Sequence, residues 1–327
     1  MLESKPARGH AAAGLHEKKM ERRTGVRSAQ WRMDMQLLLL CLPALAFFLI
    51  FAYLPMGGLI LAFKEYRYDT GILGSAWNGW KNFEFFFVSQ DAWITTRNTV
   101  GYGLIGIVLG PVLGILVALL FNEIGRKSWQ KVFQTIMILP NFMSWVVVAY
   151  IVYIMLDPVS GVFNQLLRLF GGDTVQWYAK EEYWPAILVL TNQWKGLGMG
   201  VVFYYAAMTG IDHELYEAAF LDGATRRQQA WHITIPALVP LIAILSIMGV
   251  GNLFRGDFGL YYQIPQNQGL LYGATDVIDT YVYRALSRVG DIGMSTAVGF
   301  FQSFVGLALV LLTNGIVRKI NPDSSMF

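Results

Sequence analysis

The feature that most constrains this chain is its series of long apolar runs. About 20 mainly apolar residues are enough for a helix to cross the hydrocarbon core of a bilayer. Of the 327 residues, 55% are hydrophobic and only 14% are charged, and the mean hydropathy is +0.44. A water-soluble core does not cover that much apolar surface, so the sequence predicts an all-α polytopic membrane protein with six transmembrane helices. The runs lie at 36–62, 99–121, 136–156, 183–208, 235–253 and 294–317.

The runs divide the chain into segments of different character. The first run continues past Ala44-Leu45-Ala46, so we expect an uncleaved span rather than a signal peptide. The basic tail before it either only sets the orientation or also binds anionic lipid headgroups. The expected segments are a basic cytoplasmic tail at 1–35, a first transmembrane helix at 36–62, an outer aromatic-rich segment at 63–98, a core with five further spans at 99–317 and a cytoplasmic C-terminus at 318–327.

The distribution of Lys and Arg predicts how the chain is oriented. In membrane proteins the short cytoplasmic segments carry an excess of these residues. Fifteen lie on the side that holds both termini and the polar loop at 212–236, and nine lie on the opposite side. Both termini and this polar loop are therefore expected in the cytoplasm.

Three outer segments are expected to differ from the cytoplasmic ones. The segment at 63–98 is rich in Trp, Tyr and Phe, which favours the level of the lipid headgroups. Residues 161–170 have an amphipathic pattern typical of a short helix along the outer surface. The segment at 257–291 is the longest outer loop. It either reaches an external protein or only seals the outer mouth.

The polar loop at 212–236 has the pattern of two short helices bent at a glycine. Asp212 is placed to cap the first helix, and Gly223 lies where a helix end favours a residue that tolerates positive φ. Residues 225–228 have the T-x-x-Q form of a capping box. Pro236 suits the first turn of the next span. A bent, preformed element of this kind suits docking into a cleft of a soluble partner.

Polar and aromatic side chains inside the apolar runs are candidates for a solute path. Unpaired polar groups are costly in a membrane. Lys195 lies in the middle of the fourth run, where its amine either lines a path, makes a structural ion pair, or extends toward the surface on its long stem. Aromatic faces beside amides and hydroxyls match the two sides of a sugar, although single Tyr residues also pack between helices. The candidates are Trp145, Tyr150, Tyr153, Asn192, Gln193, Lys195, Tyr204, Tyr205, Asn252 and Arg255.

Several kinds of site are missing from the sequence. It has no G-x-x-x-x-G-K-[ST] motif for a P-loop and no H-E-x-x-H motif, and all four His residues fall in the expected cytoplasmic segments. Gly196, Gly198 and Gly200 form a G-x-G-x-G pattern inside a span, which favours close helix packing or a bend over nucleotide binding. We therefore expect no catalytic, cofactor or metal site in this chain, and no nucleic-acid partner.

One motif in the polar loop resembles a known family. E-A-A-x-x-D-G-A, followed after eight residues by I-x-x-P, resembles the EAA loop of the membrane subunits of binding-protein-dependent ABC importers. Ile235 replaces a frequent Leu, and His213 stands where Pro is common, which puts only the helix start in question. The resemblance implies that Glu217 pairs with a basic residue of an ATPase cleft. The implied ATPase-coupling residues are Glu217, Ala218, Ala219, Asp222, Gly223, Ala224, Ile233 and Pro236.

Two C-terminal stretches narrow the resemblance. Residues 278–284 and 295–303 are similar to those of carbohydrate-importer permeases of the maltose type, closest to the lipo-oligosaccharide and alginate subgroup. The likeness covers roughly 37–327 and implies a type I ABC importer permease fold in a bacterial inner membrane. The implied partners are a second homologous permease, two ATPase subunits that hold ATP and Mg, an external solute-binding protein, and an oligosaccharide, acidic ones included.

Two other classes of function remain open at this point. A secondary active transporter of a sugar or other polar solute would need no ATPase and would show an internal repeat of broken helices. A membrane-embedded enzyme or sensor would need a set of catalytic groups inside the spans, and the sequence offers no such set. Co-purification of an ATPase would separate the importer from the first of these.

Overall fold

The computed structural model describes residue 31 and residues 33–320, and the chain divides into two compact units between Ile60 and Leu61. Most of the predicted basic tail and the last seven residues lie outside the described residues. An apolar helix runs over Met33–Phe63 through η1 (Leu49–Tyr53), α2 (Leu54–Met56) and η2 (Gly57–Phe63). It confirms the first predicted span as a helix.

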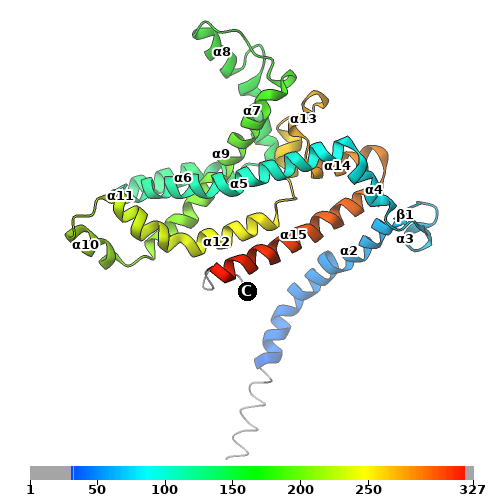
Figure 1. The fold of residues 1–327 in the computed structure, drawn as a ribbon, viewed down its shortest axis with the longest axis horizontal. Helices are drawn as coiled ribbons and strands as arrows, with labels where there is room; N and C mark the ends of the chain where they lie inside the picture. Colours follow the sequence, from blue (N-terminus) through cyan, green and yellow to red (C-terminus); the bar gives the residue numbers. More distant parts are fainter. Residues whose placement is uncertain (1–30, 32, 321–327) are drawn as a thin grey trace, which may run out of the picture. The chain divides into compact units, whose positions relative to one another are not determined.

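The unit that begins at Leu61 is almost wholly helical (Figure 1). Among its described residues the strands are two short ones, which pair antiparallel with Lys64 opposite Trp77. The elements are β1 (Lys64–Glu65), α3 (Gly71–Gly74), β2 (Ala76–Trp77), α4 (Lys81–Val88), α5 (Gln90–Asn122), α6 (Lys127–Phe142), α7 (Trp145–Leu156), α8 (Val162–Leu169), η3 (Trp177–Ala179), η4 (Glu181–Tyr183), α9 (Trp184–Thr209), α10 (His213–Leu221), α11 (Arg226–Gln229), η5 (Ala230–Thr234), α12 (Ile235–Gly251), η6 (Gly259–Gln263), η7 (Gly269–Leu271), α13 (Tyr272–Thr275), α14 (Ile278–Arg284), η8 (Ala285–Val289) and α15 (Ile292–Ile320).

Four of the predicted spans are long apolar helices in the structure. They are the helix at Met33–Phe63, α5, the continuous helix Arg226–Gly251 that contains α12, and the Ile292–Lys319 part of α15. Helix α9 has 26 residues, but its polar run around Lys195 keeps it out of this apolar group. At 1.5 Å per residue it is still about 39 Å long, enough to cross a bilayer. The count of six spans stays a prediction.

The third predicted span is not one helix. The apolar run at 136–156 is divided between α6 and α7, whose axes differ in direction by 100°. Pro140 lies three residues before the C-terminal cap of α6, and Ser144 caps the start of α7 by accepting a hydrogen bond from the Val147 amide. A proline without an N–H followed by a side-chain cap ends one helix and begins another. The third predicted span is therefore divided into two helices.

Helix α9 is the centre of the bundle, because it packs extensively against both α5 and α6. Ala118 of α5, Val201 and Tyr204 of α9 and Leu238 of α12 belong to one buried cluster. The backbones of α6 and α9 meet at Gly198, where an added Cβ would collide with the Met137 carbonyl oxygen. Small residues allow such close approach between membrane helices. The predicted role of the G-x-G-x-G pattern in close packing is confirmed at Gly198.

The outer segments contain the local structures that the sequence suggests. The short helix expected at 161–170 is α8, and it exposes Val162, Phe163, Leu166 and Leu169. In the aromatic segment Phe63 and Phe83 pack against Phe300 of α15. Several large apolar side chains of this segment remain exposed, among them Trp77, Trp80 and Trp93.

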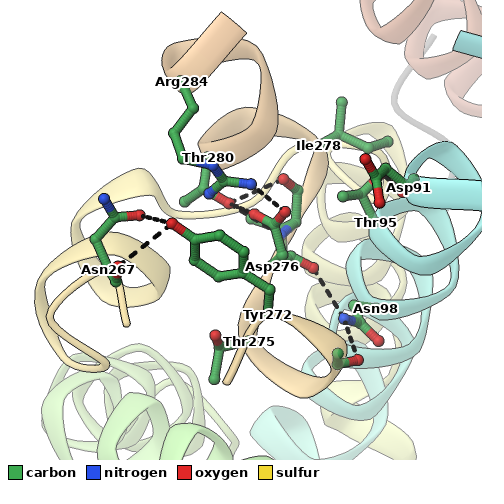
Figure 2. Close-up of polar contacts among 12 residues, drawn as sticks. Asp91, Thr95, Asn98, Asn267, Tyr272, Thr275, Asp276, Ile278, Thr280 and Arg284 are labelled. Carbon is green, nitrogen blue, oxygen red and sulfur yellow. Dashed lines mark hydrogen bonds and ion pairs between the residues drawn. The ribbon is translucent and has the colours of Figure 1, made fainter. Parts of the chain in front are cut away.

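A polar network joins the N-terminal end of α5 to α13 and α14 (Figure 2). Arg284 pairs with Asp276, and its guanidinium group lies 4.1 Å from the ring centre of Tyr272. Asn98 of α5 donates from Nδ2 to the backbone oxygens of Asp276 at 2.9 Å and Gly273 at 3.1 Å. The side chains of Asp276 and Arg284 are only 6% and 13% exposed. This buried pair therefore depends on its internal partners.

The contact between α6 and α9 predicts the effect of a small substitution. Gly198→Ala places a methyl group against the Met137 carbonyl, so the helices must separate at a cost of about 1–3 kcal/mol. We expect a clear fall in the midpoint of thermal unfolding in detergent. Gly200→Ala is the matched control, because its added Cβ meets nothing within 4 Å. Equal midpoints for the two variants would contradict the close contact.

The buried ion pair predicts a second difference between matched variants. Arg284→Met leaves the Asp276 carboxylate buried without its charge partner, which costs about 3–5 kcal/mol. Arg67→Met removes one partner of an exposed pair, whose side chains are 66% and 60% exposed, and is expected to cost about 0–1 kcal/mol. Both variants are compared by thermal unfolding at neutral pH. Similar losses would show that the Asp276 pair is solvated.

Candidate functional site

The polar loop between α9 and α12 begins with a short capped helix. The Asp212 carboxylate accepts a hydrogen bond from the Glu214 amide at 3.0 Å, so Asp212 caps α10 as predicted. At the other end Gly223 has a φ of +79°, and the amides of Gly223 and Ala224 donate to the carbonyls of Phe220 and Ala219. This is the Schellman end of a helix. The positive φ favours a residue without a Cβ at Gly223.

The second half of the loop leads without a break into α12. Thr225 and Gln228 form the predicted capping box, with the Thr225 amide donating to Gln228 Oε1 at 2.8 Å. Helix α11 continues through η5 into α12, and Pro236 occupies its first turn as expected. The hydroxyls of Tyr216 and Thr234 are 2.8 Å apart, so the two arms of the loop are tied together.

The outer surface of α10 combines one carboxylate with exposed apolar groups. Glu217 is exposed, and the described part of the chain supplies no ion-pair partner for it. Leu215, Phe220 and Leu221 are 53%, 72% and 84% exposed. In Figure 1, α10 and α11 lie at the end of the bundle where α5 turns into α6. This surface is available to a partner with a basic, partly apolar cleft.

A cavity of about 420 Å³ lies between α5, α9 and α12. Four of the predicted path residues line it, and they are Asn192, Gln193, Tyr204 and Asn252. Glycines open the space, because added Cβ atoms at Gly106, Gly110, Gly196 and Gly200 would meet nothing within 4 Å. Amides, a hydroxyl and an aromatic ring around open space suit a polar ring-shaped solute.

A second cavity of about 300 Å³ lies between α12 and α15 and contains Arg255. Arg255 donates from Nη2 to the hydroxyl oxygen of Ser303 at 3.0 Å. Nearby, Gln302 donates from Nε2 to Asp279 Oδ2 at 3.3 Å, and the Gly256 amide donates to the same oxygen at 2.6 Å. Burial raises the pKa of the Asp279 carboxyl, against the effect of these hydrogen bonds and of the Arg255 charge. Asn252 lines both cavities.

The other predicted path residues lie elsewhere. Lys195 donates from Nζ to the Asn141 carbonyl at 2.9 Å and lies 5.0 Å from the ring centre of Trp145. The structure places Tyr150 at an exposed position, Tyr153 against Tyr178, and Tyr205 against Phe121. The structure therefore brings four of the ten candidates together around the larger cavity. Arg255 lines the adjoining, smaller cavity.

Several lining residues were not among the candidates. Ser246 has a common polar side chain that no local pattern distinguishes, whereas Gln302 and Ser303 lie in the stretch 295–303 that carries the resemblance but were not named as path residues. The glycines offered a signal, since Gly103, Gly106 and Gly110 recur at helical spacing along one face of α5. Within residues 31 and 33–320, no group of three or more His, Cys, Asp or Glu is placed to hold a metal ion.

Comparison with known proteins places the chain in a family. Residues 110–325 match the family described as binding-protein-dependent transport system inner membrane component. The matched region includes the polar loop, α9, the whole lining of the smaller cavity, and the lining of the larger cavity except Gly103, Gly106 and Ile107. It covers more than half of the chain.

Relatives and solved structures agree with this match. The chain is 37% identical over 292 residues to the polygalacturonan/rhamnogalacturonan transport system permease protein YteP of Bacillus subtilis strain 168, covering 88% of this chain and 89% of that protein. A bacterial ABC transporter involved in the import of the acidic polysaccharide alginate contains a chain with a TM-score of 0.81 and 35% identity, covering 89% of this chain and 97% of that one.

A second structure shows a bacterial alginate ABC transporter in complex with an alginate pentasaccharide-bound periplasmic protein. A chain in it has a TM-score of 0.80 and 35% identity, covering 88% of this chain and 96% of its own length. Sequence family, relatives and fold thus lead to one assignment. The chain belongs to the family of binding-protein-dependent transport system inner membrane components.

Proposed function

We propose that this chain is the permease subunit of an ATP-driven importer for oligosaccharides, including acidic ones. Family membership favours this function over a secondary transporter. The saccharide class follows from relatives that carry polygalacturonan/rhamnogalacturonan and alginate. The single observation that carries the mechanism is the preformed loop with its exposed Glu217, ended at Gly223 and joined directly to α12.

The proposed assembly has five protein subunits, this chain included, around one solute. A second homologous permease completes the membrane part, and two ATPase subunits bind ATP and Mg on the cytoplasmic side. The fifth is an external solute-binding protein, as in the alginate transporter complex with its periplasmic protein. The excess of Lys and Arg on one side supports a cytoplasmic position for the loop and for both termini in a bacterial inner membrane.

The proposed saccharide path passes the two cavities beside α12. Asn192, Gln193 and Asn252 offer amides to sugar hydroxyls, and Tyr204 offers an aromatic face. Arg255 in the adjoining cavity offers a cation to a carboxylate group of an acidic saccharide. Because Asn252 lines both cavities, the two sets of groups adjoin each other.

The proposed mechanism is alternating access driven by a difference in ATP affinity. ATP binding closes the ATPase pair, and the loop held in its cleft moves with it. Because the loop continues into α12, this movement reaches the helix that lines both cavities. ATP must bind one state of the complex more tightly than the other to shift the equilibrium. Hydrolysis and product release then return the path to the cytoplasmic side.

Reversal of the charge at Glu217 tests the coupling. Glu217→Lys replaces a charge-assisted contact of about 1.5–3 kcal/mol with repulsion, so we expect stimulated ATPase activity to fall about tenfold or more. The variant should still insert, because Glu217 is exposed. Activity is measured in proteoliposomes with the ATPase subunits, partner permease and binding protein. Glu214→Lys, on the same helix, is the control, and normal stimulation of Glu217→Lys would reject the coupling role.

Filling the cavity between α5, α9 and α12 tests the path. Gly106 faces this cavity with no atom within 4 Å of an added Cβ, so Gly106→Leu places a large apolar group in the space. We expect ATP-dependent uptake of an alginate pentasaccharide to be lost while the complex still assembles. Gly101→Leu changes an equally open position of α5 outside the cavity lining and should retain uptake. Equal uptake by the two variants would exclude this cavity from the path.

A further inference from the structure

The bend between α6 and α7 leaves backbone carbonyls at the end of α6 without hydrogen-bond partners in their own helix. The last four carbonyls of a helix have no partner within that helix. Inside an apolar bundle such groups need a partner from the protein itself. Helix α6 ends at Phe142, and the Met143 amide donates to the Pro140 carbonyl at 3.2 Å. Asn141 is among the last four residues of α6, so its carbonyl needs a donor from outside the helix.

Lys195 of α9 supplies a donor at this end. Its Nζ lies 2.9 Å from the carbonyl oxygen of Asn141, the residue before the last of α6. The charge sign is also favourable, because a helix C-terminus carries partial negative charge and is stabilised by a nearby cation. The side chain is half-buried, so solvent screens the attraction only in part.

The same ammonium group reaches the first residue of α7. It lies 5.0 Å from the ring centre of Trp145, within the range of a cation–π interaction. The Trp145 indole N–H donates to Asp257 Oδ2 at 2.8 Å, and the other oxygen of Asp257 accepts from the Gly259 amide at 2.9 Å. Donation to a carboxylate makes the indole ring more electron-rich, which strengthens its attraction for the cation.

Two glycines hold the partners of Lys195 at close range. An added Cβ at Gly198 would collide with the Met137 carbonyl of α6, and one at Gly259 would collide with the Trp145 indole. The first contact fixes α6 on α9 one turn after Lys195. The second contact holds Trp145, the first residue of α7, against Gly259 in the segment that follows α12. The helices on both sides of the bend are therefore held by contacts with other parts of the chain.

Lys195 does not face the proposed saccharide path. Neither cavity beside α12 is lined by Lys195, although its neighbours Asn192, Gln193 and Gly196 line the larger one. We propose that Lys195 is a positioning residue, which locks the bend between α6 and α7 and links it through Trp145 to Asp257. This role goes beyond the proposed function, since it concerns how the bundle keeps its shape during transport.

The position of the bend gives this lock a role in transport. Helix α6 begins after the turn that follows α5, at the end of the bundle where α10 and α11 lie, and α7 leads away to α8 (Figure 1). A movement of α6 is passed on to α7 only while the angle between them is held. Without the lock, α6 and α7 move independently and part of the movement is lost.

Uptake by the assembled importer tests the proposal first. Lys195→Met keeps the length of the side chain but removes its charge and its donors. We expect uptake of an oligogalacturonate and of a neutral oligosaccharide of equal length to fall by the same factor, about fivefold or more. Lys195→Arg, which keeps a cation and donors, should restore most of the uptake. Lys180→Met, at an exposed lysine outside the bundle contacts, should behave as the unmodified protein.

The geometry of the bend is measured separately. Cys41 is the only cysteine, so Cys41→Ser gives a background for spin labels at Ile136 of α6 and Ile154 of α7, which are 59% and 50% exposed. We expect Lys195→Met to broaden the distribution of distances between the labels. Trp145→Phe keeps an aromatic ring but loses the indole N–H, so this variant should broaden the distance distribution less than Lys195→Met does. The double variant Lys195→Met/Trp145→Phe should show a distribution hardly broader than that of Lys195→Met alone, because both substitutions break the same chain of contacts from Asn141 to Asp257.

Two results would overturn the proposal. One is a loss of uptake confined to the acidic saccharide with an unchanged distance distribution, which would make Lys195 a substrate-binding residue. The other is unchanged uptake and distances in Lys195→Met. Failure of the importer function itself looks different, since the unmodified complex would then show no ATP-dependent uptake.

Discussion

The fold depends on how a helical bundle in a bilayer satisfies backbone groups where a helix stops. Water is absent there, so every interrupted carbonyl needs a donor from a neighbouring element. Helix α9 supports α6 in two ways. At Gly198 the two backbones touch, and at Lys195 a cation reaches the end of α6. The sharp bend into α7, begun by Pro140 and the Ser144 cap, is thus supported by α9.

Glycines have two opposite effects in the same bundle. At Gly198 and Gly259 the missing side chain lets another element approach to contact, so the glycine closes space. At Gly106, Gly196 and Gly200 the missing side chain has no neighbour, so the glycine opens space. Helix α9 carries both kinds within two turns. One face of this helix therefore supports α6, while another borders the cavity with Asn192 and Gln193.

The sequence predicted those features whose causes lie within a few residues. The cap at Asp212, the helix end at Gly223 and the capping box at 225–228 all depend on contacts no more than a turn away. The apolar run continues through 142–145, so the hydrophobic pattern does not define the sharp bend there. Its support comes from Lys195, which is 54 residues from Asn141, and from Asp257, which is 112 residues from Trp145. No local pattern contains such pairings.

The same reasoning explains which parts of the candidate path were foreseen. Polar residues inside an apolar run stand out by composition, so Lys195, Asn192 and Asn252 were all noticed. Composition does not show which way a side chain points. In the structure the amides border open space and the ammonium group meets a carbonyl and a ring. A cation needs more compensation than an amide when it leaves water, so the more strongly polar group takes the more completely partnered position.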